Sequence, residues 1–118
     1  MLLLMVFSAF STIQLKAEVK NTAIIGEWLY EVSDAPSGYQ KGSLIFSEKE
    51  GQLICIVKIE AGELEVSNLK LKDQKITFTT YVDGNPINVD LTIEANKMTG
   101  KVDSPEGLKT LTAVKKES

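Results

Sequence analysis

The chain has 118 residues and a formal charge of −3 at neutral pH, from 13 basic and 16 acidic side chains. Every basic side chain is a lysine, since the sequence contains neither arginine nor histidine. This composition excludes imidazole chemistry, bidentate phosphate binding by a guanidinium and the basic surface that nucleic acid requires, so we expect a single domain that is not an enzyme and holds no cofactor or metal.

The first 17 residues, MLLLMVFSAFSTIQLKA, have the order of a secretory signal. An apolar run over residues 2–10, too short to span a bilayer, is followed by polar residues and the small residue Ala17. The basic start of such a signal is missing, because no lysine precedes Lys16. We expect cleavage near Ala17 or Ala9 and a secreted or periplasmic domain over residues 18–118 without a membrane span; a retained hydrophobic N-terminal helix is the alternative.

From residue 24 onward, apolar and polar residues alternate with a period of two, which is typical of strands. Gly, Pro, Asn and Asp separate the alternating segments, and connections this short join only neighbouring antiparallel strands. The expected strands lie near 26–33, 42–47, 52–60, 63–71, 75–82, 86–93, 97–103 and 108–115. Because closure removes the exposed edges of such a meander, the sequence predicts an all-β, antiparallel, eight-stranded up-and-down barrel. An open or sandwiched antiparallel sheet is the alternative.

Several local features of the sequence carry further expectations. In the fourth strand the apolar positions change parity between Val66 and Leu69, which predicts a bulge around residues 67–68. Cys55 lies in the apolar run LICIVKI and is interpreted as a buried small hydrophobe, whereas Tyr81 is expected to point outward. The acidic residues of 60–65 and 103–106 fit no calcium loop, and we interpret them as a solvated rim.

The stretch GEWLYEV opens the first strand, and its Gly26-Glu27-Trp28 resembles the Gly-x-Trp signature of calycins, the group that includes lipocalins, fatty-acid-binding proteins and avidins. The segments KITF and MTGKV are similar to those of small exported lipocalin-like proteins of bacteria. This resemblance covers residues 24–115 as a pattern and rests on one motif of three residues. It implies a barrel whose mouth is overhung by the longest connection, SDAPSGYQKG.

The same resemblance implies that Trp28 closes the narrow end of the barrel beneath a cationic side chain of the last strand. Lipocalins usually supply an arginine there, but this chain offers only Lys115 or Lys116, which can cover the indole through a cation–π contact. We therefore interpret Trp28 as an end plug, with ligand contact as the alternative. A biotin site of the avidin type is not expected, because such sites use several tryptophans.

Our first functional hypothesis is that the barrel binds a small apolar or amphipathic ligand in its lumen by displacing poorly ordered water. Tyr30 and Thr80 are the polar groups expected to orient the ligand. The candidate lumen residues are Trp28, Tyr30, Phe46, Val57, Phe78, Thr80, Val89 and Leu91.

The alternative hypothesis is a protein-binding barrel with a filled core, such as an exported inhibitor or an adhesion accessory. It would act through the loop of residues 34–42 and the N-terminal arm of residues 18–25. Pro36 and Tyr39 are the candidate contact residues of that loop, because an exposed aromatic side chain can anchor an interface.

Overall fold

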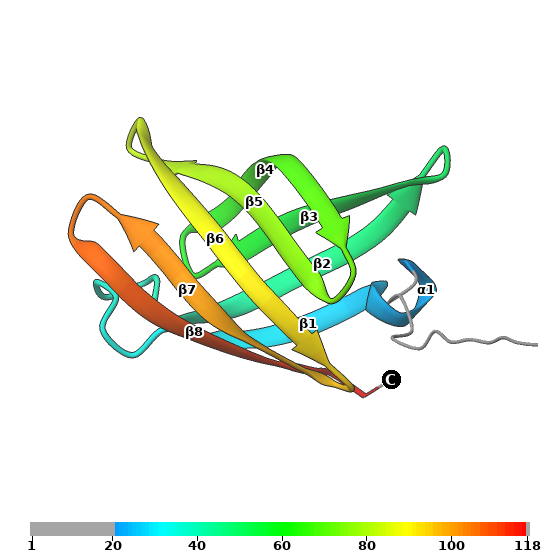
Figure 1. The fold of residues 1–118 in the computed structure, drawn as a ribbon. Helices are drawn as coiled ribbons and strands as arrows, with labels where there is room; N and C mark the ends of the chain where they lie inside the picture. The colour runs from blue at the N-terminus through cyan, green and yellow to red at the C-terminus, as the bar shows by residue number, and fades with distance from the viewer. Residues whose placement is uncertain (1–20, 118) are drawn as a thin grey trace, which may run out of the picture.

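The computed structural model describes residues 21–117, and within them it contains one short helix and eight strands (Figure 1). Their bounds are α1 Asn21–Ile24, β1 Gly26–Glu31, β2 Lys41–Lys49, β3 Gln52–Ile59, β4 Gly62–Lys72, β5 Lys75–Val82, β6 Asn85–Glu94, β7 Lys97–Ser104 and β8 Gly107–Lys115. Each strand pairs antiparallel with its neighbours in the chain, and β8 pairs with β1, so the sheet closes into a barrel. The predicted fold class is confirmed.

The turns of the barrel follow the sequence signals that predicted them. Asp83 and Gly84 both have positive φ angles, of 53° and 81°, as a two-residue type I′ hairpin requires. The register between β4 and β5 shifts between Ser67 and Lys70, and Asn68 has a φ angle of 55°. The bulge predicted at residues 67–68 is therefore confirmed, and it turns Leu69 to the same side of β4 as Val66.

Apart from Ile24 of α1, the core consists of the inward-facing strand residues that the alternation predicted. Cys55 is buried with an exposed fraction of 6%, and Tyr81 is 55% exposed on the outer face, as expected. The buried hydrophobic residues are Ile24, Trp28, Tyr30, Val32, Leu44, Phe46, Cys55, Val57, Ile76, Phe78, Val89, Leu91, Ile93, Met98, Leu111 and Ala113.

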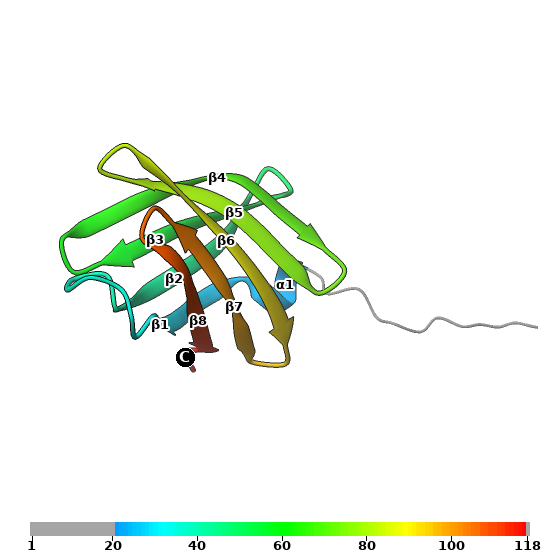
Figure 2. The same ribbon diagram turned by 60° about the vertical axis from the view of Figure 1, so that its left-hand side comes forward.

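The two ends of the barrel differ in what covers them. A meander of this order places the β1–β2, β3–β4, β5–β6 and β7–β8 connections at one end and the other hairpins, with α1, at the opposite end. Figure 2 shows this separation, with the β1–β2 loop on the left and α1 on the right. We call the first end the mouth and the second the closed end.

Helix α1 is a finding that the sequence pattern did not predict, because four residues are too few to show a helical period. Its Ile24 is fully buried against the closed end, so part of the expected N-terminal arm belongs to the core.

The predicted signal of residues 1–17 lies outside the described residues. Within 21–117, no helix has the length and apolar character needed to cross a membrane.

Candidate ligand-binding site

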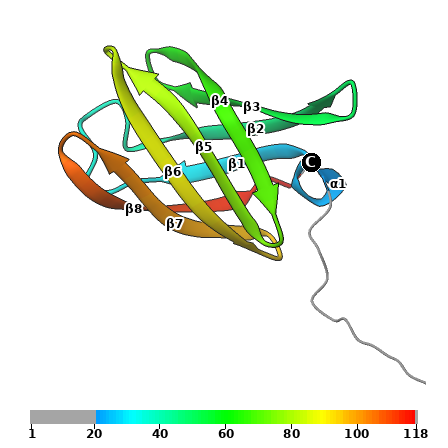
Figure 3. The same cartoon turned by 45° about the horizontal axis from the view of Figure 1, so that its top comes forward.

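Trp28 lies at the closed end and is fully buried. Its indole Nε1 donates a hydrogen bond to the carbonyl oxygen of Ile24 at 2.8 Å. The ammonium of Lys115 lies 5.8 Å from the ring centroid and donates a hydrogen bond to the carbonyl oxygen of Ala23 at 3.1 Å. Figure 3 shows the C-terminal end of the chain beside α1, where these contacts form. The cation expected over the indole is therefore Lys115.

The other lysine considered for this role, Lys116, has a different partner. Its ammonium lies 3.8 Å from a carboxylate oxygen of Glu27, and its backbone N–H donates to the carbonyl oxygen of Glu27 at 2.8 Å. Ser43 donates a further hydrogen bond of 2.7 Å to that carboxylate and lowers the pKa of Glu27. These contacts tie the end of β8 to β1 and β2 on the outer surface, away from the indole.

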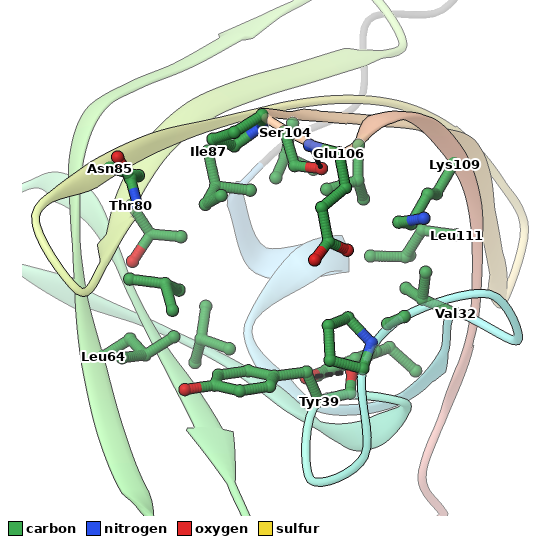
Figure 4. Close-up of a pocket in the computed structure, with 18 of the residues that line it drawn as sticks. Val32, Tyr39, Leu64, Thr80, Asn85, Ile87, Ser104, Glu106, Lys109 and Leu111 are labelled. Atoms are coloured by element: carbon green, nitrogen blue, oxygen red, sulfur yellow. Dashed lines mark hydrogen bonds between the residues drawn. The ribbon is translucent and has the colours of Figure 1, made fainter.

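At the mouth, a cavity of about 330 Å³ extends into the barrel (Figure 4). Its walls are predominantly hydrophobic and come from strands on every side of the barrel. The apolar side chains that line it belong to Val32, Ala35, Leu44, Val57, Leu64, Phe78, Val82, Ile87, Val89, Val102 and Leu111. The barrel is therefore hollow toward the mouth, whereas its closed end is packed with large side chains.

The structure brings five of the predicted lumen residues to this cavity, namely Tyr30, Val57, Phe78, Thr80 and Val89. The other three, Trp28, Phe46 and Leu91, do not line it. They face the interior as predicted, but they lie among the packed side chains of the core and are at most 1% exposed. Alternation distinguishes the inner face of a strand from its outer face, but it does not distinguish the two ends of the barrel.

Pro36 and Tyr39, predicted as contacts for a protein partner, line the mouth of the cavity, and Figure 4 shows Tyr39 at the opening. The loop that carries them is closed by hydrogen bonds of its own. The backbone N–H of Val32 donates to the carbonyl oxygen of Gln40 at 2.7 Å, and that of Tyr39 donates to the carbonyl oxygen of Pro36 at 3.0 Å. The loop overhangs the mouth, as the resemblance to calycins implied.

Two hydroxyl groups lie inside the cavity. Thr80 Oγ1 donates to the carbonyl oxygen of Glu65 at 2.7 Å, so toward the cavity it acts as an acceptor. The Tyr30 hydroxyl donates to the carbonyl oxygen of Tyr39 at a long 3.4 Å, and burial raises the pKa of Tyr30. Both groups are therefore neutral at physiological pH and suit polar but uncharged contacts.

The rim contains residues that sequence reasoning did not assign to the site. They come from the β5–β6 and β7–β8 turns and from the strand ends that flank these turns. These rim residues are Asp83, Asn85, Ser104, Pro105, Glu106 and Lys109. Their location could have been inferred from the meander, because alternate connections of a meander share one end of the barrel.

The acidic residues of the described chain do not gather into a metal site. Within residues 21–117 there is no group of three or more His, Cys, Asp or Glu side chains that could hold a metal ion. The chemistry that the lining offers is apolar contact, hydrogen bonding by hydroxyl groups and charge at the rim.

Comparisons with known proteins find similar folds but identify no family. No protein-family model matches the chain, and no curated protein matches it. Among solved structures, a mutant of the fluorescent protein UnaG is similar with a TM-score of 0.55 and 11% identity, covering 84% of this chain and 100% of that one.

Two redesigned β-barrels are also similar. One, with a TM-score of 0.54 and 12% identity, covers 83% of this chain and 95% of its own. The other, mFAP1 bound to DFHBI, has a TM-score of 0.52 and 11% identity and covers 81% of this chain and 97% of its own. At such low identity these similarities show the shared small-barrel fold.

Proposed function

We propose that this protein binds a small apolar or amphipathic ligand in the cavity at the mouth of its barrel. The observation that carries the proposal is the combination of a hollow mouth and a packed closed end in one barrel. The volume of the cavity, about 330 Å³, is within the usual range of small-molecule sites.

Binding would be driven by the release of poorly ordered water from the apolar walls. The hydroxyls of Tyr30 and Thr80 would orient a ligand without requiring it to carry a charge deep in the barrel. The similarity to mFAP1, a barrel of this fold with a bound small molecule, supports this use of the architecture.

The alternative of a protein-binding barrel has less support. Its premise is a filled core, whereas the mouth of this barrel contains a cavity. Its contact residues, Pro36 and Tyr39, are part of the lining of that cavity. We therefore keep the loop in the proposal as a cover for the ligand.

We also propose that the protein is exported, because residues 1–17 have the order of a secretory signal.

The proposal is tested by native mass spectrometry of the protein purified gently from its own source, followed by solvent extraction of bound molecules. Phe78→Trp enlarges an inward side chain of the cavity wall, and Tyr81→Trp makes a matched change on the outer face of the same strand. A reproducible apolar adduct that is lost in Phe78→Trp and kept in Tyr81→Trp supports the proposal. An adduct equally abundant in both variants contradicts it.

A further inference from the structure

Strand β8 turns two lysines toward the interior of the barrel, one near each end. Lys109 and Lys115 share the inward-facing side of the strand with Leu111 and Ala113, and both lysines are half-buried. Lys115, at the closed end, contacts the Trp28 ring and donates to the carbonyl oxygen of Ala23. Its position is explained by its partners.

Lys109, at the mouth, has no such partners among residues 21–117. The ion pairs of this part of the chain join Lys75 to Asp90 and Lys116 to Glu27, and no hydrogen bond from the Lys109 ammonium is formed there. Figure 4 shows the Lys109 nitrogen directed toward the opening of the cavity. Lys109 is half-buried, and burial costs a charged group part of its hydration; a bound anion would compensate for that cost.

We propose that the ligand is an anionic amphiphile, whose charged head lies at the mouth against Lys109 while its apolar tail fills the cavity. This inference rests on the function proposed above and specifies the ligand class. Of the described residues that line the cavity, Lys109 is the only cationic one, and the groups deeper in the wall are uncharged. An anionic head would be costly to bury there, so the head stays at the rim.

The carboxylates of the rim define the competing possibility, a cationic ligand. Asp83 and Glu106 line the cavity but are exposed, so water already satisfies their charge. Figure 4 shows the Glu106 side chain reaching over the opening. Glu106 would therefore repel an approaching anion, and Glu106→Gln should tighten the binding of an anionic amphiphile and leave a neutral one unaffected.

The test measures how dodecanoate, dodecanol and dodecyltrimethylammonium displace the neutral dye N-phenylnaphthylamine from the full domain, below their micelle concentrations. The chains of these three probes match, so their affinities differ through the head group alone. The variant Lys109→Met removes the inward charge, and Lys101→Met removes a charge from the outer face of the neighbouring strand as a matched control. Thermal unfolding checks that each variant is folded.

We expect dodecanoate to bind more tightly than dodecanol, and Lys109→Met to weaken dodecanoate about tenfold, the usual effect of losing one charge-assisted hydrogen bond. Dodecanol should be unaffected by that change, and Lys101→Met should affect neither probe. Lys109→Glu should reverse the preference toward dodecyltrimethylammonium.

The two proposals fail in different ways. Equal binding of dodecanoate and dodecanol, unchanged by Lys109→Met, would overturn the anionic ligand class and leave lumen binding intact. If dodecyltrimethylammonium bound most tightly to the unmodified protein, the carboxylates of the rim, and not Lys109, would determine the charge of the ligand. If no probe and no dye binds, or if all bind Phe78→Trp equally well, lumen binding itself is refuted.

Discussion

At the scale of single residues, Trp28 is used as a structural plug. All of its surface is buried, its indole N–H has a partner in α1 and its ring has a cation above it. None of these contacts reaches the cavity at the mouth, whose lining does not include Trp28. The structure thus separates a residue that holds the barrel closed from residues that can meet a ligand.

We expect Trp28→Phe to lower the free energy of unfolding by about 2–4 kcal/mol, because it leaves the carbonyl oxygen of Ile24 without its donor and opens space around the smaller ring. Urea denaturation measures the loss, and Tyr81→Phe on the outer face is the control. Affinity for dodecanoate should not change in the folded protein. A loss of affinity beyond that of the control would contradict the plug and show that Trp28 contacts the ligand.

Cys55 is a second residue whose role is structural. Burial raises the pKa of its thiol to about 12, from an ordinary value of 9.0. The folded pKa therefore exceeds the unfolded one, so the thiol's contribution to stability is complete below about pH 9 and is lost as the pH rises toward 12.

Because only the thiolate reacts, we expect Cys55 to react with a disulfide reagent at mildly alkaline pH about a thousandfold more slowly in the native protein than in urea, a factor that corresponds to a pKa difference of three. Absorbance of the released thiol gives both rates. Equal rates in the two states would show that the thiol is exposed in the native protein.

At the scale of elements, the β1–β2 loop and the turns opposite it together form the mouth. The loop is closed by the Val32–Gln40 and Tyr39–Pro36 backbone hydrogen bonds, which hold Tyr39 at the opening. Deeper in the barrel, β6 and β7 approach so closely at Gly100 that a Cβ atom there would meet the backbone of Asp90 and Leu91. A Cβ atom at Gly42, beside the mouth, would likewise meet the backbone of Lys58. The strands are thus fixed by close packing, whereas the opening of the mouth is bounded by connections.

We expect Tyr39→Ala to increase the rate at which N-phenylnaphthylamine leaves the barrel about fivefold, the effect of losing one aromatic contact of about 1 kcal/mol. Stopped-flow fluorescence measures this rate, and Tyr81→Ala on the outer face is the control. If the two variants release the dye at the same rate, the loop does not cover the bound molecule, and the hypothesis of a protein contact at Pro36 and Tyr39 would regain support.

At the scale of the whole molecule, the barrel has packed side chains at one end and a cavity at the other, and α1 belongs to the packed end. The described chain therefore begins, at Asn21, on the side away from the mouth.

We expect the chain, expressed from Met1 in a bacterium, to be recovered from the exported fraction with its new N-terminus near residue 18, as its signal-like order indicates. N-terminal sequencing after fractionation identifies the position. A variant that places Lys at positions 6 and 7, in the middle of the apolar run, is the control and should stay inside the cell. Recovery of the unmodified chain with residues 1–17 intact would instead favour a retained hydrophobic helix.

The sequence by itself determined the eight strands, the inner face of each and the bulge in β4, whereas the place of Trp28 at the closed end was implied only by the resemblance of Gly26-Glu27-Trp28 to the calycin signature. These features depend on residues close together in the chain: alternation, turn chemistry and a change of parity are all local. The number of strands and the short connections then left closure as the way to remove exposed edges.

Only the tertiary structure decided which inward residues meet the cavity. Phe46 and Leu91 have the same inward parity as Val57 and Val89, yet the first two are packed and the last two line the cavity. The difference depends on how far along the barrel each residue lies and on what the strands opposite place beside it. The meander order alone brings the turns of the rim to one end of the barrel. That Lys109 lines the cavity there, together with Asp83 and Glu106, became visible only once the barrel had closed.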